Sequence, residues 1–335
     1  MAASCPDRAR YRRREIALRY VVHAAALAPS VYNTQPWRFA AGQDSIRLYA
    51  DPDRKLAGAD SDGRELLISC GAALANACLA MRQLGFAAEV RLLPELGHPD
   101  LLAEIGWGPY IRPAAWEDRL YQSIQLRRTH RGAFTADAPP ELASELARMA
   151  WHDRAELQII YDPGRRAALA ELTGIAERVQ RACPELAAER GRWARSPGDL
   201  RRDGVPAGAG PARSDQPEFA AREFGRVAAQ RRTLLPSPRA VGLVALLTTR
   251  DDSRQSRLLA GHALQRLLLH ATAHGVSAAF HTQPLELFRI RDQVRSQFTA
   301  GAYPQMLLRL GYASDTAATP RRPVTAMLTN AVPGA

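Results

Sequence analysis

The most informative stretch of this chain is Ala28-Pro29-Ser30-Val31-Tyr32-Asn33-Thr34-Gln35-Pro36-Trp37-Arg38-Phe39. Each proline lacks a backbone N–H donor and has a fixed φ, so a helix that precedes this stretch must end here. Asn33 and Gln35 offer both hydrogen-bond donors and acceptors, which suits the polar edge of a flat ligand. The alternative is an ordinary proline-bounded loop whose Trp37 and Phe39 pack into a core.

Hydrophobic spacing around this stretch predicts a mixture of helices and strands. Apolar residues recur at helical intervals before it, which predicts a helix over about 14–27. Alternation predicts a strand over 45–50, and the Ala- and Leu-rich residues 63–84 predict a helix that is buried on most sides. Further strands are expected at 87–93, 241–248 and 304–312, and further helices at 116–126 and 140–149.

The composition is that of a globular protein with an arginine-rich surface. The 335 residues, 46% apolar and 24% charged, suffice for one large domain or two of ordinary size. The formal charge of +11 comes almost wholly from arginine, since Lys55 is the only lysine. Arginine favours forked contacts with phosphates and carboxylates, so an anionic ligand is expected. The basic residues are spread along the chain without a finger, basic zipper or aromatic RNA-binding signature, which argues against nucleic acid.

Cysteine usage and the N-terminal region favour a cytoplasmic protein without a membrane segment. The chain contains four cysteines, which are Cys5, Cys70, Cys78 and Cys183. They show neither C-x-x-C pairs nor ligand spacing with histidine, so neither disulfides nor a metal site is expected. Residues 12–27 superficially resemble a twin-arginine signal peptide, but Arg19 and His23 interrupt the apolar run, and an amphipathic helix is the better interpretation.

Comparison of the two halves indicates an internal duplication. Residues 70–90 align without gaps on residues 260–280 with six identities, among them Gly71 with Gly261. A strand pattern and an Asp-rich turn precede both segments. We therefore expect two diverged halves, 1–115 and 116–335, although two similar but unrelated buried helices would give the same pattern.

Residues 189–238 are rich in Gly, Pro and Arg and are expected to be irregular. Loops of this length in compact domains are usually functional covers or disordered links. Trp193, Phe219 and Phe224 give the segment side chains to bury. We therefore expect a folded, lid-like insertion of the second half that covers a site.

Arg127, Arg128 and Arg131 flank Thr129 at the end of a predicted helix. Three guanidinium groups and a hydroxyl are able to meet a phosphate through charge-assisted hydrogen bonds. A solvated surface is the alternative for this cluster.

Two of these motifs resemble segments of the nitroreductase superfamily of FMN proteins. Residues 29–37 resemble its Pro-Ser-x-x-Asn-x-Gln-Pro-Trp segment, which lies beside the flavin ring. Residues 127–134 resemble its Arg-Arg-Ser-x-Arg-x-Phe segment, which holds the FMN phosphate and ribityl chain. In that family the two segments come from different subunits. The doubled layout, over roughly residues 14–323, resembles the actinobacterial Acg-like branch, although Tyr32 stands where histidine is common there.

The resemblance implies an α+β, nitroreductase-like fold: an internally duplicated pseudo-dimer whose antiparallel sheets are wrapped by helices. It implies one FMN per chain, because each half lacks the motif that the other carries. The residues that it assigns to FMN binding are Pro29, Ser30, Asn33, Gln35, Arg127, Arg128, Thr129, Arg131, Gly275, Ser277, Ala278, Arg321 and Arg322.

The implied function is NAD(P)H-dependent reduction of a quinone, nitroaromatic or related electrophile. No catalytic side chain is expected, since the flavin N5 carries the chemistry. The chain has no Gly-x-Gly-x-x-Gly motif, so NADPH or NADH would dock transiently. The expected partner is a small-molecule acceptor, with neither nucleic acid nor membrane, and the expected state is a pseudo-dimeric monomer, with a homodimer as the alternative. The alternative function is a non-turnover protein that sequesters FMN under its lid.

Overall fold

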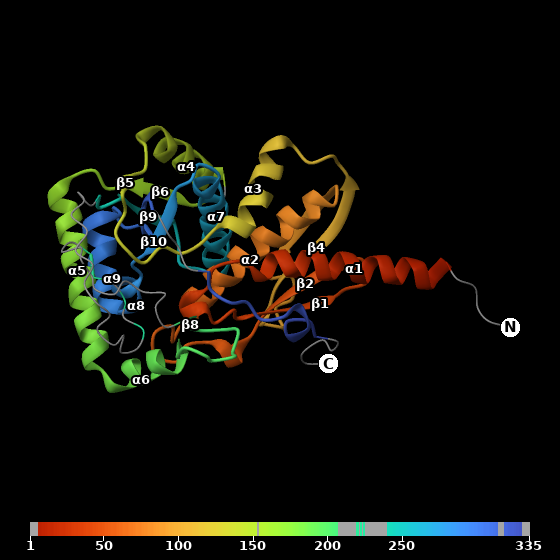
Figure 1. The fold of residues 1–335 in the computed structure, drawn as a ribbon, viewed down its shortest axis with the longest axis horizontal. Helices are drawn as coiled ribbons and strands as arrows, with labels where there is room; N and C mark the ends of the chain where they lie inside the picture. Colours follow the sequence, from red (N-terminus) through yellow and green to blue (C-terminus); the bar gives the residue numbers. More distant parts are fainter. Residues whose placement is uncertain are drawn as a thin grey trace.

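The computed structural model describes residues 6–152, 154–206, 219–220, 222, 224, 240–313 and 318–329. These residues form two antiparallel β-sheets with helices around them, which is the expected α+β class (Figure 1). Two long helices, α2 (Arg64–Gln83) and α7 (Arg254–Ala273), lie between the sheets.

The first sheet has the strand order β1-β2-β4-β3, and all of its pairs are antiparallel. Its strands are β1 (Trp37–Ala41), β2 (Ser45–Ala50), β3 (Phe86–Leu92) and β4 (Leu101–Tyr110). Helices α1 (Pro6–Ala26), α2 and α3 (Ala115–Leu126) contribute to the core that this sheet buries. Trp37 and Phe39 lie fully inside that core, as the packing interpretation of the opening stretch requires.

The second sheet has the order β10-β11-β9-β6, and β5 pairs with β11. Its strands are β5 (Ala136–Asp137), β6 (Glu156–Ile159), β9 (Leu243–Thr249), β10 (Ser277–Phe280) and β11 (Tyr303–Tyr312). Successive side chains of a strand point to opposite faces. On one face of β9, Ala245 and Leu247 pack with α4 (Pro140–His152) and α7. On the other face, Val244 and Leu246 pack with α5 (Pro163–Ala182), α8 (Gln283–Glu286) and α9 (Phe288–Phe298).

Helices α2 and α7 approach each other so closely that both need glycine at the crossing. A Cβ atom on Gly71 would overlap the carbonyl oxygen of Leu258, and one on Gly261 would overlap that of Ile68. Gly71 and Gly261 are equivalent in the predicted repeat, and so are Ile68 and Leu258. The crossing is therefore approximately symmetric, as the equivalent positions of the predicted repeat would require.

The structure corrects the start of the segment that was expected to be irregular. Helix α6 (Pro184–Trp193) extends into it and begins at a proline in its first turn, where proline is favoured. Two short strands follow, β7 (Ala194–Arg195) and β8 (Val205–Pro206). Residues 207–218, 221, 223 and 225–238 of the segment lie outside the described residues.

The predicted aromatic anchors of this segment are buried. Phe219 is 1% exposed and belongs to the core that includes α5 and α9. Trp193 and Phe224 pack in a small cluster with Tyr32 and Leu56. This part of the segment is therefore folded onto the body of the protein.

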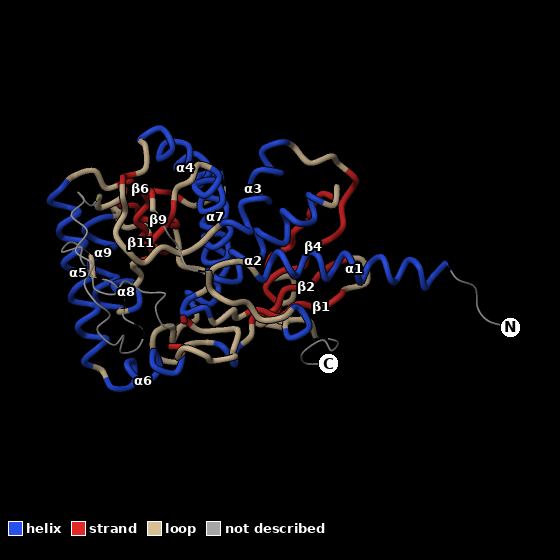
Figure 2. The backbone as a smooth tube through the Cα atoms, in the orientation of Figure 1, coloured by secondary structure: helices blue, strands red, loops and turns tan. Residues whose placement is uncertain are grey.

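The chain returns to the first sheet at its end. The backbone N–H of Phe39 donates to the carbonyl oxygen of Met327 at 2.7 Å, and that of Thr329 donates to Phe39 at 2.8 Å. A short 3₁₀ turn at Val324–Ala326 precedes these contacts, and Figure 2 shows this segment beside β1.

Most predicted elements agree with the structure within a few residues, but α1 begins at Pro6 and not near residue 14. No disulfide joins Cys70, Cys78 and Cys183, whereas Cys5 lies outside the described residues. Within the described chain, α2 is the helix whose length and composition would suit a membrane span. Since 94% of its apolar window is buried, it is a core helix.

Candidate functional site

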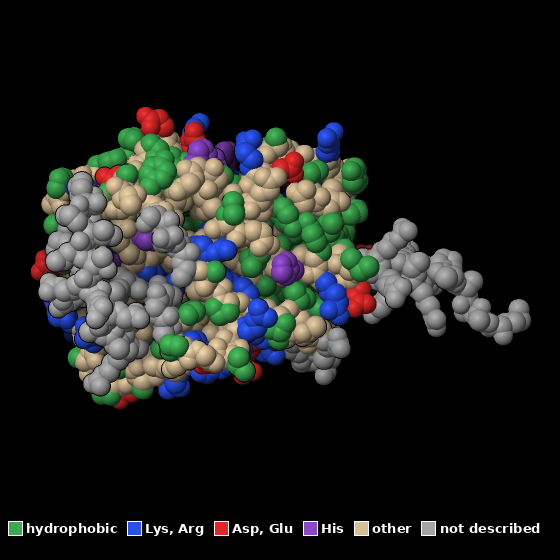
Figure 3. Space-filling model, in the orientation of Figure 1, with side chains coloured by type: hydrophobic (Ala, Val, Ile, Leu, Met, Phe, Trp, Pro, Cys, Tyr) green, Lys and Arg blue, Asp and Glu red, His purple; other side chains and the backbone are tan. Residues whose placement is uncertain are grey.

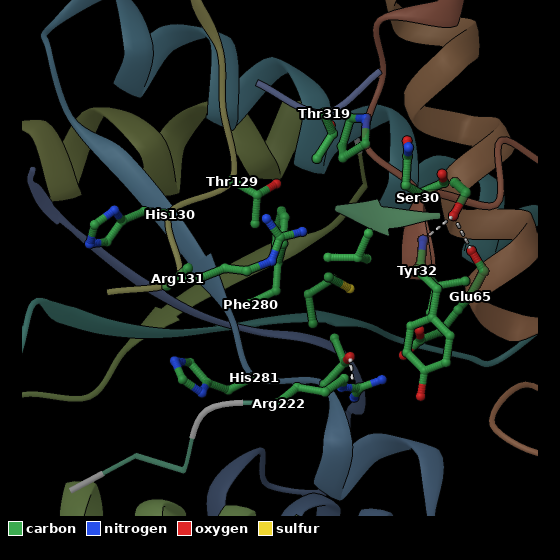
Figure 4. Close-up of a pocket in the computed structure, with 18 of the residues that line it drawn as sticks. Ser30, Tyr32, Glu65, Thr129, His130, Arg131, Arg222, Phe280, His281 and Thr319 are labelled. Atoms are coloured by element: carbon green, nitrogen blue, oxygen red, sulfur yellow. Dashed lines mark hydrogen bonds between the residues drawn. The ribbon is translucent and has the colours of Figure 1, made fainter. Parts of the chain in front are cut away.

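A cavity of about 360 Å³ lies between the two halves of the chain. This volume lies within the range of small-molecule and cofactor sites. The first half supplies residues 29–33 and part of α2, and the second half supplies residues 129–133, 279–282 and Arg321. Figure 4 shows Arg131 and Arg222 beside this space, with Tyr32 and Glu65 on another side of it.

The loop that supplies residues 29–33 has an unusual backbone. Tyr32, Asn33 and Gln35 have φ angles of 49°, 56° and 52°, in the left-handed region that residues with side chains rarely adopt. The hydroxyl of Ser30 accepts a hydrogen bond from the Gln35 N–H at 2.9 Å and helps to hold this conformation. Such strain is concentrated at functional sites.

The two amides of this loop bind other segments of the protein. The Asn33 Nδ2 donates to the carbonyl oxygens of Gly204 and Pro320 at 2.9 and 3.0 Å. The Gln35 Nε2 donates to the Arg202 carbonyl at 2.9 Å, and its Oε1 accepts from the Arg322 N–H at 2.8 Å. Asn33 and Gln35 therefore join the loop to residues 202–204 and to residues 320–322, and Gln35 does not line the cavity.

Four arginines, Arg127, Arg128, Arg131 and Arg321, form a cluster at the cavity. Arg127 is only 4% exposed, and burial followed by the charges of Arg321, Arg128 and Arg131 lowers its pKa to about 9. Loss of solvent, followed by neighbouring arginines, lowers the pKa of Arg131 and that of Arg321 to about 10.

This cluster has hydrogen-bond donors to spare. Within the described part of the chain, Nε and Nη1 of Arg127 and Nε of Arg321 are buried without a hydrogen-bond partner. No ion pair with a described carboxylate involves Arg127 or Arg321. Buried cationic donors without acceptors are costly, so this arrangement favours an anionic ligand such as a phosphate group.

A second charged group lies at another wall of the cavity. Glu65 is buried at the start of α2, and burial followed by the charge of Glu286 raises its pKa well above the usual range. Arg222 forms an ion pair with Glu286 and lies 5.0 Å above the ring of Tyr32. Phe224 meets the same ring edge-on at 5.0 Å.

The segment that was expected to cover a site therefore contributes to the cavity wall, through Phe219, Arg222 and Phe224. The contact of Arg222 with Glu286 and that of Phe224 with Tyr32 hold it against the body of the protein.

Two histidines line the cavity and are neutral. His281 Nε2 accepts a hydrogen bond from Nε of Arg309 at 2.9 Å, and burial followed by the Arg309 charge lowers its pKa well below the usual range. His130 Nε2 lies 2.9 Å from the Ala133 carbonyl oxygen, and burial lowers its pKa as well. Neither histidine carries a charge at neutral pH.

The structure brings many of the sequence-predicted site residues together. Those that line the cavity are Pro29, Ser30, Asn33, Thr129, Arg131 and Arg321. Those that adjoin it through contacts or charge are Gln35, Arg127, Arg128, Ala278 and Arg322.

Gly275 and Ser277 do not line the cavity. Gly275 follows α7 with a φ of 73°, and Ser277 begins β10, so the lining on this side comes from Ala279, Phe280 and His281 farther along. A direct role of Gly275 and Ser277 at a ligand therefore stays a prediction.

Sequence reasoning missed Glu65, Glu286 and Arg222. An acidic residue at the start of an otherwise apolar helix was a signal for Glu65. No local pattern distinguished Glu286 and Arg222, because the ion pair between them forms only when the fold brings their two segments together.

The two sheets, the paired central helices and the cavity with contributions from both halves define an α+β protein with a ligand-sized cavity between its halves. No protein-family model matches the chain. Rv3131 from Mycobacterium tuberculosis, a protein named as an NAD(P)H nitroreductase, is 36% identical over 91% of this chain and 89% of its own. The protein named Acg from the same organism is 33% identical, over 92% of this chain and 93% of its own. The chain belongs to this nitroreductase family.

Solved structures resemble the chain more distantly. A nitroreductase with bound FMN from Desulfitobacterium hafniense has a TM-score of 0.41 and 12% identity, and covers 64% of this chain with 98% of its own. The FMN-dependent nitroreductase NfnB from Mycobacterium smegmatis, in complex with NADPH, has a TM-score of 0.39 and 17% identity, over 64% of this chain and 99% of its own.

Proposed function

We propose that this chain binds one FMN in the cavity between its halves and reduces a small electrophile at the expense of NAD(P)H. The observation that carries the proposal is the arginine cluster, because Arg127 and Arg321 hold buried donors that lack acceptors among the described residues. A phosphate group supplies such acceptors. The names of Rv3131 and Acg, and the FMN and NADPH named for more distant nitroreductases, support the same cofactors.

The residues that would hold FMN fall into two sets. Arg127, Arg131 and Arg321 offer charged donors to the phosphate. Apolar side chains of the cavity suit a flat ring, and these are Ile68, Ala72, Leu264, Phe280 and Met306. When bound, FMN supplies hydride transfer: two electrons and one proton pass from NAD(P)H to a quinone, nitroaromatic or related acceptor, and water provides a second proton. We propose that the protein acts in the cytoplasm and that one chain, as a pseudo-dimeric monomer, forms the complete site.

The test is an anaerobic titration of the FMN-loaded protein with NADPH and then NADH, followed by visible absorbance. Loss of the oxidised-flavin absorbance at a catalytic rate, and its return when a quinone is added, is the expected result. Protein that cannot be loaded with FMN would refute the proposal, and FMN that stays oxidised while dithionite reduces it would refute the reductase activity.

A second candidate function, storage of FMN without turnover, is favoured by the wall that Phe219, Arg222 and Phe224 form. A wall that stays closed excludes nicotinamide, whereas one that opens only gates it. Under this alternative, Phe224→Ala and Arg222→Ala should make FMN reducible by NADPH, because they remove the contacts with Tyr32 and Glu286. Leu200→Ala, at an exposed position before this wall, is the control. Equal rates in all four proteins would count against occlusion.

A further inference from the structure

A cluster of potential metal ligands lies outside the cavity, at the surface between α4 and α7. Its members are Glu145 on α4, and His270 and His274 at and just beyond the end of α7. One ligand atom from each lies within 4.8 Å of the other two, and His270 Nε2 is 2.8 Å from Glu145 Oε2. Histidine side chains are visible at the surface beside α4 (Figure 3).

The geometry requires little change to hold an ion. His270 and His274 are one helical turn apart and therefore project from the same face. Zn²⁺ binds imidazole nitrogen at about 2.0–2.1 Å in tetrahedral geometry, which puts neighbouring ligand atoms about 3.4 Å apart. One present separation is 2.8 Å and the others are at most 4.8 Å, so small side-chain rotations are sufficient to reach this value.

The surroundings also prepare the ligands. His274 Nδ1 is 2.9 Å from the His270 carbonyl oxygen, which makes Nδ1 the protonated nitrogen and leaves the Nε2 lone pair available. Such a hydrogen bond from the second ring nitrogen is typical of metal-bound histidine. Glu145 Oε2 already lies 2.8 Å from His270 Nε2, so this carboxylate is directed toward the proposed site. Arg148 is the nearby positive group that opposes a cation.

We propose that Glu145, His270 and His274 bind one divalent transition-metal ion of the zinc type, with water completing the coordination. Two nitrogens and one carboxylate suit such an ion better than Mg²⁺ or Ca²⁺, which prefer oxygen ligands. The ion would join α4 to the end of α7, just before β10, whose last residues line the cavity. The sequence predicted no metal site because 125 residues separate Glu145 from His270.

The test uses full-length, untagged protein, freed of metal with a chelator and measured with and without FMN. Calorimetric titration with Zn²⁺ should show one site per chain, and Zn²⁺ should raise the melting temperature. His274→Ala and Glu145→Gln should each weaken binding by more than about tenfold. His23→Ala, which removes an exposed histidine of α1, should bind as the wild type does.

Co²⁺ gives an independent readout, because its visible spectrum reports tetrahedral nitrogen and oxygen ligands. The proposal would be overturned if the wild-type protein bound no Zn²⁺, or if His274→Ala bound Zn²⁺ as tightly as the wild type does. Since metal binding is measured with and without FMN, its outcome is separate from that of the flavin titration.

Discussion

Arg127 ends α3 with 4% of its surface exposed, and its positive neighbours include Arg321, Arg128 and Arg131. A buried cation that is repelled by its neighbours lowers the stability of the folded chain, and a bound anion would offset this cost. At another wall, Glu65 is buried near Glu286, whose charge repels it, while Arg64 and Arg222 attract it. Single buried charges therefore link the stability of this protein to its ligand and to pH.

Replacing Arg127 with methionine should have opposite effects on stability and binding. The flavin-free variant should be more stable by about 1–4 kcal/mol, because a buried, poorly paired charge is replaced by an apolar side chain. FMN affinity should fall about tenfold to a hundredfold with the lost charge-assisted hydrogen bonds. Urea unfolding and a fluorescence titration measure the two effects. The exposed control Arg19→Met loses only an i,i+4 ion pair with Glu15, so it should change stability by less than about 0.5 kcal/mol and leave FMN affinity unchanged. Unchanged FMN affinity in Arg127→Met would remove Arg127 from the site.

Glu65 should make stability fall as the pH rises. Burial and Glu286 raise its folded-state pKa above the ordinary value of 4.5. The folded chain therefore keeps a proton that the unfolded chain loses, and the stabilisation present below pH 4.5 is lost as the pH rises toward the folded-state pKa.

Glu65→Gln removes this titration. The variant should gain stability relative to wild type between pH 5 and pH 8, by at most about 1.4 kcal/mol per pH unit. Urea unfolding at several pH values checks this, with the exposed Glu15→Gln as control. A difference between Glu65→Gln and wild type that does not vary with pH would contradict the prediction.

At the scale of elements, the crossing of α2 and α7 determines how the two sheets are placed. Two glycines permit backbone contact there, and the carbonyl groups of Ile68 and Leu258 occupy the space that a side chain would need. The cavity lies against the same helices, since Ile68, Ala72 and Leu264 line it. Close packing at the crossing therefore also shapes the site.

Gly71→Ala should lower the free energy of unfolding by about 1–3 kcal/mol or more, because the added methyl group meets backbone that cannot rotate away. Gly261→Ala should behave alike, as the proposed repeat requires. The control is Gly191→Ala in α6, where a Cβ would meet nothing within 4 Å and helix propensity improves by up to about 1 kcal/mol. Denaturant unfolding distinguishes them, and equal stabilities of Gly71→Ala and Gly191→Ala would refute the tight crossing.

At the scale of the whole molecule, the second half contributes segments to the first sheet and its core. The C-terminal residues 324–329 leave the second sheet and bind β1 of the first. Leu258 and Leu269 of α7 also belong to the first core. The boundary proposed between residues 115 and 116 therefore does not separate independent cores, and the repeat on either side of it stays a prediction.

Met327 is fully buried in the first core although it follows the second sheet in the chain. Met327→Ala should lower stability by about 2–5 kcal/mol through the cavity it leaves. It should also speed amide exchange at Phe39, whose N–H donates to Met327. Leu96→Ala, at a fully exposed position, should change stability by less than about 0.5 kcal/mol. Normal exchange at Phe39 in Met327→Ala would show that the C-terminal segment does not hold β1.

The sequence alone determined many of the elements and the approximate place of the motifs. Strand β2 spans the predicted residues 45–50, and α3 begins one residue from its predicted start. Hydrophobic period and proline constraints are local properties, so they are readable without the fold. They also indicated the arginine motif, because its residues are neighbours in the chain.

Only the tertiary structure decided what these side chains contact. Asn33 and Gln35 were both expected to face a ligand, but only Asn33 lines the cavity. Their amides also bind Gly204 and Arg202, 171 and 167 residues away. The pairing of Arg222 with Glu286 and the approach of Glu145 to His270 likewise join distant segments. Burial, pKa and hydrogen-bond partners depend on which segments meet in space, and no local pattern in the chain contains that information.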